Sequence, residues 1–313
     1  PTGVKIFNWL GTIWGGKLTL NTPMLFALGF IGMFVIGGLS GVTHSVVPAD
    51  TQQTDTYYIV AHFHYVLFGG ALFGIFSGLY FWFPKVWGKM YNETMGKIHF
   101  WLMIIGFNLT FGPMHWLGLQ GQVRRTWVYA EETNLGFWNL IVTIGAFILA
   151  VATLVFMANW MYSRRKGEVA PFDPWDARTI EWSIPSPTPV WNFSKAPEVK
   201  SLDDFWHQKY GEDEDGRAVR REGADDLLVQ LEDEGLNPKE EIHLPSPSYF
   251  PIILAFGLPF IGYAVIYKSI PLALIGVILL LIGGFGWGTE PLEEEFESSE
   301  EEKPDIEESQ NYE

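Results

Sequence analysis

The sequence predicts an all-α fold, in which a polytopic bundle of transmembrane helices is followed by a C-terminal transmembrane hairpin. Of the 313 residues, 48% are hydrophobic and 16% are aromatic, a composition typical of bilayer proteins with aromatic belts at both interfaces. Apolar runs close to the ~20 residues that span hydrocarbon recur along the chain, at 23–42, 57–83, 98–119, 137–162, 250–267 and 270–287. Because backbone polar groups must be satisfied within each span, these runs are expected to be helices. With a half-helix at 2–14, they predict about seven membrane helices.

The net charge of −16 belongs to two polar segments rather than to the apolar body. Acidic residues dominate 199–242 and 290–313, and such blocks are typical of solvated chain. Prolines and charged residues alternate through 167–248 without a sustained hydrophobic period, which predicts an extended, partly ordered linker with a short helix near 224–234. We therefore expect a membrane core at 1–166, a Pro-rich and acidic linker at 167–248, a two-helix hairpin at 249–288 and an acidic disordered tail at 289–313.

The positions of Lys and Arg indicate how the chain crosses the membrane. Loop 84–97 carries three lysines, and 164–166 reads Arg-Arg-Lys. Two crossings separate these places, so they lie on one face, which the positive-inside rule makes cytoplasmic. The linker and the tail then face the cytoplasm as well. Arg124 and Arg125 fall on the opposite face, which a bound ligand would explain; the alternative is two ordinary interfacial arginines.

Two histidines lie inside the second full span, His62 and His64. Ionisable groups in a membrane span are costly and mark functional sites. At about 100° per residue, positions i and i+2 point some 200° apart, so the two imidazoles cannot share one metal. Neutral imidazole is a common axial ligand of haem iron, and one helix with a haem on each side requires this spacing. The alternative is a pair of structural histidines that bond neighbouring helices. The chain has no cysteine, which excludes disulfides and thiolate metal sites.

Several motifs resemble subunit I of cytochrome c oxidase, in the haem-copper oxidase superfamily. The resemblance runs from Pro1 to about Phe193, and it implies the C-terminal part of the twelve-helix bundle of that subunit. It rests on 55–66 (DTYYIVAHFHYV), 1–5 (PTGVK), 97–100 (KIHF), 118–119 (GL) followed by 124–125 (RR), and 181–183 (EWS).

The resemblance implies roles for individual residues. His62 would be the proximal ligand of the high-spin haem, at the catalytic centre where oxygen is reduced. His64 would be an axial ligand of the low-spin haem. Other cofactor contacts are implied at the haem propionates (Arg124, Arg125), beside the oxygen-binding haem (Asp50) and at the helix start (Tyr57). Asp55 matches a magnesium ligand, but Thr54 stands where the family has a histidine beside it. Thr2 and Lys5 match a proton pathway to the oxygen site.

The intact protein is accordingly expected to pass electrons from cytochrome c through two haems of the a type to a haem-copper centre, with proton translocation. The resemblance implies oxidase subunits II and III as partners, a bacterial plasma membrane and no nucleic acid. The family's copper-binding histidines would lie upstream of Pro1, so the chain is expected to be a fragment that is inactive alone. Residues 243–288 resemble a small two-helix accessory subunit of actinobacterial oxidases. The alternatives are a quinol oxidase or nitric oxide reductase of the same superfamily, or a non-catalytic haem-binding membrane protein.

Overall fold

The computed structural model describes residues 1–237 and 247–290, and the chain divides into two compact units, Pro1–Lys239 and Glu240–Glu313. The predicted acidic tail lies outside the described residues, apart from its first two positions. Within the described ranges, six helices are long and apolar enough to cross a membrane. This confirms the all-α membrane architecture that the apolar runs predict.

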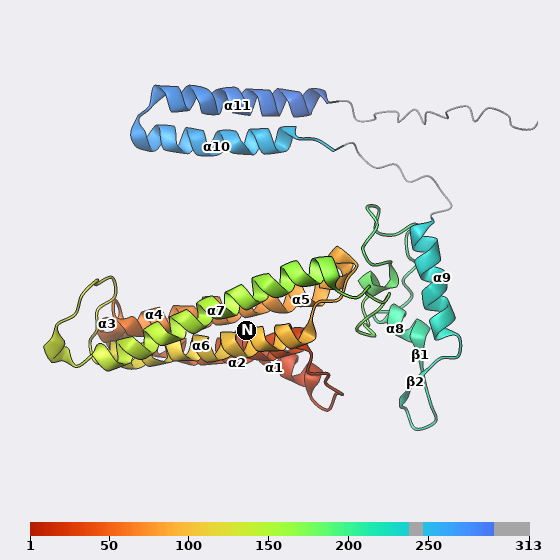
Figure 1. The fold of residues 1–313 in the computed structure, drawn as a ribbon, viewed down its shortest axis with the longest axis horizontal. Helices are drawn as coiled ribbons and strands as arrows, with labels where there is room; N and C mark the ends of the chain where they lie inside the picture. Colours follow the sequence, from red (N-terminus) through yellow and green to blue (C-terminus); the bar gives the residue numbers. More distant parts are fainter. Residues whose placement is uncertain (238–246, 291–313) are drawn as a thin grey trace, which may run out of the picture. The chain divides into compact units, whose positions relative to one another are not determined.

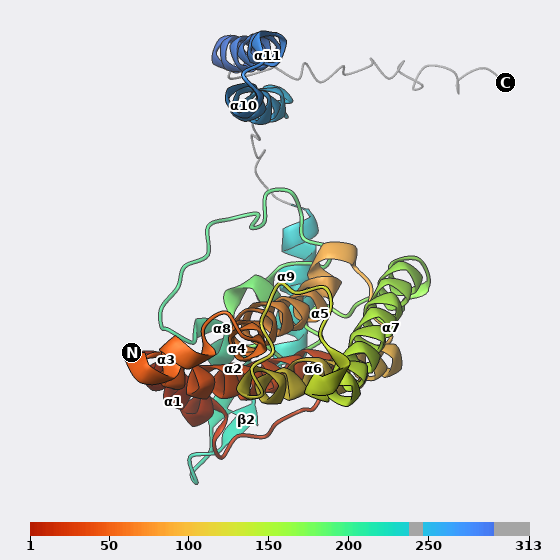
Figure 2. The same cartoon turned by 90° about the vertical axis from the view of Figure 1, so that its left-hand side faces the viewer.

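The first unit is a bundle of long helices, seen from the side in Figure 1 and along its axis in Figure 2. Its elements are α1 (Thr2–Ile13), α2 (Thr22–His44), α3 (Val47–Gln53), α4 (Tyr57–Val66), the π-helical turn η1 (Leu67–Leu72), α5 (Phe73–Trp87), α6 (Glu93–Leu119), the 3-10 turn η2 (Glu131–Thr133) and α7 (Gly136–Lys166). The segment α4–η1–α5 is one continuous membrane span. The bundle therefore has two ends: the Arg124 end, where α2 finishes and α4 starts, and the Lys166 end, where α5 and α7 finish.

Polar caps and a glycine set the helix ends that hydropathy leaves undefined. The side chains of Asn21, Thr56 and Asn92 accept hydrogen bonds from backbone N–H groups in the first turns of α2, α4 and α6, which satisfies donors that a helix start leaves free. The span expected to stop before Pro84 instead continues to Trp87 and ends at Gly88, whose φ is +60°. Hydropathy detects the stretch in hydrocarbon, whereas the hydrogen-bonded helix extends past it.

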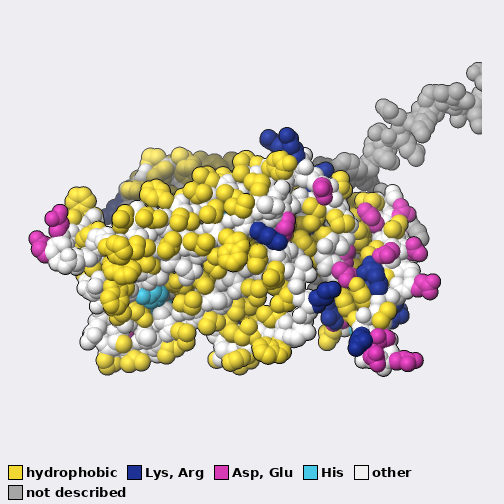
Figure 3. All heavy atoms as spheres, turned by 60° about the horizontal axis from the view of Figure 1, so that its bottom comes forward, with side chains coloured by type: hydrophobic (Ala, Val, Ile, Leu, Met, Phe, Trp, Pro, Cys, Tyr) yellow, Lys and Arg dark blue, Asp and Glu magenta, His cyan; other side chains and the backbone are white. Residues whose placement is uncertain are grey.

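The core of the bundle is built largely from aromatic rings. Phe26 on α2 is fully buried and packs against Phe73, Phe76 and Tyr80 of α5 and Phe100 of α6, with ring centroids 5.2–5.9 Å apart. The face of the bundle drawn in Figure 3 is covered mainly by hydrophobic side chains, while acidic and basic side chains gather at the end formed by the segment after α7. Such a surface suits contact with lipid.

The segment after α7 is folded, which differs from the extended linker that its composition predicts. It contains η3 (Ile180–Ser183), α8 (Asp204–Lys209), strands β1 (Tyr210–Glu212) and β2 (Ala218–Arg220), which pair antiparallel, and α9 (Ala224–Leu236). The predicted short helix near 224–234 corresponds to α9. A buried lysine organises the segment.

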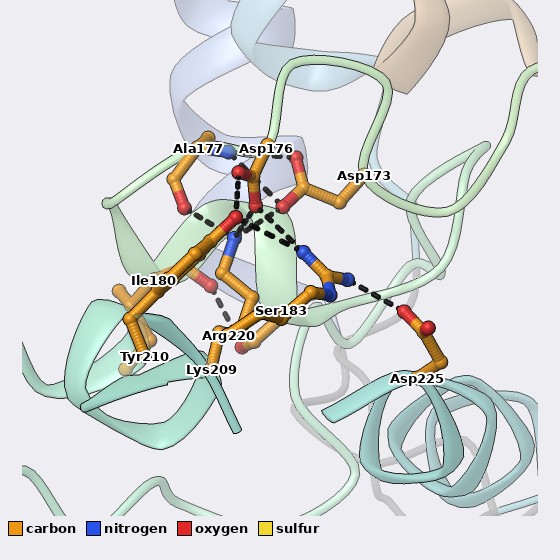
Figure 4. Close-up of polar contacts among 9 residues, drawn as sticks. All are labelled: Asp173, Asp176, Ala177, Ile180, Ser183, Lys209, Tyr210, Arg220 and Asp225. Carbon is orange, nitrogen blue, oxygen red and sulfur yellow. Dashed lines mark hydrogen bonds and ion pairs between the residues drawn. The ribbon is translucent and has the colours of Figure 1, made fainter. Parts of the chain in front are cut away.

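Lys209 is fully buried and holds the segment together through charges (Figure 4). Its Nζ donates to Asp173 Oδ2 at 2.7 Å, Asp176 Oδ1 at 3.0 Å and the carbonyl of Ala177 at 2.7 Å. Burial alone would raise the pKa of Asp176, but hydrogen bonds from Tyr210 and Lys209 outweigh it and hold that pKa below its ordinary value. Charged residues that composition assigns to solvent are thus internal to a fold.

The second unit contains α10 (Phe250–Tyr267) and α11 (Ile270–Thr289), the antiparallel hairpin that the two-residue turn predicts. The two helices approach closely at glycines. A Cβ on Gly257 would lie 2.9 Å from the carbonyl oxygen of Gly276, so the absence of side chains brings the backbones together. These two glycines serve the packing of the hairpin itself.

Candidate functional site

The imidazole of His62 lies against one face of α2. Its Nδ1 is 2.9 Å from the carbonyl oxygen of Gly37 and 3.0 Å from Ser40 Oγ. A Cβ on Gly41 would lie 3.0 Å from the ring's Cε1. Gly37, Ser40 and Gly41 are spaced i, i+3 and i+4, so they share a helix face. The small residues of this face allow the ring to approach the α2 backbone.

The imidazole of His64 points to a different neighbour, α6. Its ring stacks on Phe111 with centroids 4.1 Å apart and planes within 14°. Its Nδ1 lies 2.7 Å from the carbonyl oxygen of Val60, one turn earlier in α4. His62 and His64 therefore occupy different faces of α4, as the i, i+2 spacing predicts.

The donor set of these two histidines fits axial ligation of haem iron. In each ring Nδ1 lies at hydrogen-bond distance from a backbone carbonyl, which favours the tautomer that carries its proton on Nδ1 and leaves the Nε2 lone pair free. Among the described residues, no group of three or more His, Asp or Glu side chains is placed to hold a metal ion. Single imidazoles of this kind suit an iron whose other ligands come from a porphyrin.

A π-helical turn follows the two histidines directly. Residues Leu67–Leu72 form η1, which contains the buried Gly69 and Gly70. Single π-turns inside long helices are rare and frequently occur at functional sites. The hydrophobic pattern of the span gives no signal for this turn, because its apolar residues suit an α-helix equally well.

The loop after α6 docks on the start of α4 at the Arg124 end. Tyr57 N donates to the carbonyl of Gln122 at 2.9 Å, and Arg124 N donates to the carbonyl of Asp55 at 2.8 Å. The Arg124 guanidinium also pairs with Asp55 Oδ1, with Nε at 2.7 Å. The structure thus joins two residues to which the family resemblance gives separate roles, propionate binding and magnesium binding.

Backbone strain marks the same loop contact. Asp55 has a φ of +61° and Arg125 a φ of +64°, conformations that cost free energy in residues other than glycine. Both flank the point where Thr56 and Val123 form an antiparallel bridge. The contact between the loop and α4 therefore fixes the backbone conformation at Arg124 and Arg125.

The remaining predicted residues are spread over three elements. Asp50 lies in the first turn of α3, partly buried. Tyr57 is the first residue of α4 and packs against the aromatic core. Thr2 and Lys5 lie on α1 with exposed side chains, and the Lys5 ammonium lies 5.7 Å from the centre of the Trp9 ring.

One residue beside the histidine pair has no predicted role. The His44 ring lies 4.8 Å from the His62 ring, measured between centroids. His44 is seven residues after Gly37 and three after Gly41, which continues the α2 face that meets His62. That periodicity is the signal in the sequence that could have identified it.

Comparison with known proteins places part of this sequence in a family. Residues 1–148 match the family described as cytochrome c and quinol oxidase polypeptide I. This part of the chain belongs to that family. Together with the six candidate spans of the described residues, this match makes the chain a multi-pass membrane protein that is similar to polypeptide I of cytochrome c and quinol oxidases.

Individual relatives extend the similarity along the chain. Cytochrome c oxidase subunit 1 of Alkalihalophilus pseudofirmus is 43% identical over 285 residues, 91% of this chain and 43% of that protein. The Synechocystis protein of the same name is 53% identical over 197 residues, 63% of this chain and 35% of that protein. Quinol oxidase subunit 1 of Bacillus subtilis is 39% identical over 286 residues, 90% of this chain and 41% of that protein.

The aligned lengths show how much of each relative this chain covers and how far along the chain the similarity extends. The chain spans less than half the length of each of them. The part of the chain left out of the 91% alignment is shorter than the hairpin segment 249–288. Similarity to subunit I therefore reaches into the hairpin, past the residues near 193 where the sequence motifs end.

Proposed function

We propose that this chain is part of subunit I of a respiratory terminal oxidase that passes electrons from cytochrome c, through a low-spin haem, to a haem-copper centre that reduces oxygen to water with proton translocation. One observation carries the proposal. Two imidazoles on different faces of one membrane helix each have Nδ1 at hydrogen-bond distance from a backbone carbonyl, which favours the tautomer whose Nε2 lone pair can bind iron.

In the proposed site, the protein orients the ligands and the cofactors carry the redox chemistry. When bound, the haems and copper supply one-electron transfer and the reduction of oxygen. His62 would hold the high-spin haem, with its ring fixed by Gly37 and Ser40. His64 would hold the low-spin haem, with its ring fixed by Val60 and the face of Phe111. A ligand held in this way keeps its orientation through a redox cycle.

Residues at the Arg124 end would hold the polar edge of the cofactors. Guanidinium groups match carboxylates in charge and in fork geometry, so Arg124 and Arg125 would bind haem propionates. Asp50 would lie beside the oxygen-binding haem, and Tyr57 would line the site at the start of α4. Asp55 is proposed as a magnesium ligand, since hard cations prefer carboxylate oxygen.

The proton path and the surroundings complete the proposal. Thr2 and Lys5 on α1 would carry protons towards the oxygen site. The haems are proposed to be of the a type, and copper would be bound by histidines outside this chain. Subunits II and III, cytochrome c and lipid would be the partners. The Lys166 end and the acidic tail would face the cytoplasm of a bacterial plasma membrane.

Single histidine substitutions in the full-length oxidase test the proposal. We expect His62→Ala to remove the optical band of the high-spin haem and His64→Ala to remove that of the low-spin haem, because each imidazole serves its own iron. His207→Ala, in the extramembrane helix α8, is the matched control and should keep both bands. If both membrane substitutions abolished the same band, or if neither changed the spectrum, the two-haem assignment would be wrong.

A second candidate is a quinol oxidase, which is supported by the 39% identity to a quinol oxidase subunit 1. The two candidates differ in the electron donor and not in the histidine pair. Steady-state oxygen consumption by the purified full-length complex, with either reduced cytochrome c or a quinol as donor, separates them. Turnover with quinol alone would replace the first proposal with the second.

A further inference from the structure

His44 is a half-buried side chain whose two ring nitrogens are buried and lack partners among the described residues. It lies in the last turn of α2, at the Arg124 end of the bundle. Both Nδ1 and Nε2 are shielded from solvent, and neither has a hydrogen-bond partner among the described residues. A buried polar group without a partner costs considerable free energy. A histidine kept in this position therefore indicates a ligand that the chain's own side chains do not provide.

The surroundings of His44 narrow the nature of that ligand. Its nearest rings are His62 at 4.8 Å and Tyr58 at 5.4 Å, measured between centroids, and the Tyr58 ring lies 5.0 Å from that of His115. Aromatic faces offer few hydrogen-bond partners for a bridging water, which needs about two to four of them. An anionic acceptor at this place would suit both the imidazole donor and the arginine pair at the same end of the bundle.

The position of His44 relative to His62 identifies a suitable acceptor. The two residues meet because α2 presents Gly37, Ser40, Gly41 and His44 on one face, spaced i, i+3, i+4 and i+7. His62 lies a little more than one turn into α4, so an iron held by His62 would lie towards the end of the bundle where His44 is found. A porphyrin carries its carboxylates on one edge, and that edge is the polar one.

We propose that His44 donates a hydrogen bond to a propionate carboxylate of the haem that His62 binds. The inference rests on the proposed function, since it assumes that His62 is a haem ligand. His44 acts as a positioning residue: it compensates the charge of the carboxylate and fixes the edge of the macrocycle. Helix α2 would then position the bound haem at two points: the Gly37 carbonyl would orient the ligand His62, and the His44 side chain would hold the propionate.

Removal of the His44 nitrogens in the full-length oxidase tests the proposal. His44→Phe keeps an aromatic ring against His62 and Tyr58 but has no donor, whereas His44→Gln keeps a donor. Thr43→Val, the neighbouring residue on α2, is the matched control, because its hydroxyl bonds to Ser40 O and Gln53. Three quantities are measured: haem content, the propionate bands of the high-spin haem in resonance Raman spectra, and the ratio of reduced to oxidised haem at a fixed potential for each of the two haems.

We expect His44→Phe to keep both haems and to shift the propionate band of the high-spin haem. At a fixed applied potential, the ratio of reduced to oxidised high-spin haem should also fall about threefold or more, because an uncompensated carboxylate stabilises ferric iron. His44→Gln should restore most of both effects, and Thr43→Val should cause neither. An unchanged band and an unchanged equilibrium in His44→Phe would overturn the proposal and leave water as the partner of His44. If His44→Phe failed to assemble, a propionate band in His44→Gln equal to that of an unbonded carboxylate would overturn it as well.

The outcome separates this inference from the proposed function. If His62→Ala leaves the high-spin haem in place, the proposed function fails whatever His44 does. If His62→Ala removes that haem while His44→Phe changes neither the propionate band nor the equilibrium, the role of His44 alone is refuted.

Discussion

Lys209 allows a quantitative test of the fold that follows α7. Its side chain is fully buried, and its partner Asp173 is 2% exposed, with 2.7 Å between Nζ and Oδ2. The ammonium also donates to Asp176 and to the carbonyl of Ala177. Replacing it by Met keeps most of the volume of the side chain but leaves the Asp173 carboxylate buried without its counter-charge.

The expected effect follows from that uncompensated charge. Breaking a buried ion pair by removing one partner destabilises a protein by about 3–5 kcal/mol. Since each 1.4 kcal/mol changes an equilibrium about tenfold, Lys209→Met should raise local opening of the segment at least about 100-fold. The membrane spans should be unaffected, because Lys209 lies outside them.

Hydrogen exchange measured by mass spectrometry on the full-length protein reports this opening. The amide of Arg221 is a suitable probe, since it donates to the carbonyl of Lys209 at 2.8 Å. The control is Arg217→Met, because Arg217 and Asp215 form a pair 3.7 Å apart with side chains 79% and 72% exposed. Such exposed pairs contribute about 0–1 kcal/mol, so exchange should barely change.

A double substitution decides whether charge is the cause. Lys209→Met with Asp173→Asn removes the stranded carboxylate charge and should recover much of the lost protection. If the double variant were as destabilised as Lys209→Met, or if Lys209→Met matched the Arg217→Met control, the network would not stabilise the segment in the way argued above.

Two further predictions concern a helix contact and an acid response. In Gly118→Ala the new Cβ would overlap the backbone nitrogen of Tyr58, so we expect a lower Tm of the full-length protein and a free energy of unfolding lower by about 1–3 kcal/mol or more. The control is Gly112→Ala on the same helix, where the new Cβ would lie 3.6 Å from its nearest neighbour and should have little effect. Equal losses of stability in the two variants would refute the close contact. Asp176 has a lowered pKa in the folded state, so its stabilisation is present above its unfolded pKa of about 3.9 and is lost as the pH falls through the lower folded value. Exchange in the segment should therefore rise in acid below about pH 4, and Asp176→Asn should remove part of that rise; an identical acid response in the variant would contradict the assignment.

The membrane architecture could be predicted from the sequence because hydrocarbon imposes a local rule on every span. The divergence of His62 and His64 could be predicted for the same reason, since it depends only on helix geometry. The fold of 167–237 could not, because its core depends on Lys209 meeting Asp173 across more than thirty residues. Composition cannot distinguish such a pair from solvated charges.

The site shows the same division between local and distant contacts. The ion pair of Arg124 with Asp55 joins two loops 69 residues apart in the chain, which spacing alone does not indicate. The π-helical turn also escapes prediction, because it changes the hydrogen bonding of an apolar run without changing its composition. His44 is different: its place on the Gly37 face of α2 could be read from periodicity once His62 was known to meet that face.

Backbone atoms make part of the contacts that position α4. A Cβ on Gly37 would lie 2.9 Å from the backbone of Tyr65 and Val66, and Tyr57 N is bonded to the loop after α6 at 2.9 Å. The helix is thus held from α2 and from α6 independently of the imidazoles at 62 and 64. Substituting either histidine removes that ring's contact with α2 or α6 but leaves these backbone contacts in place, so we expect the helix to keep its position. This is the reason that the loss of one optical band, with the other retained, can be read as the loss of one axial ligand.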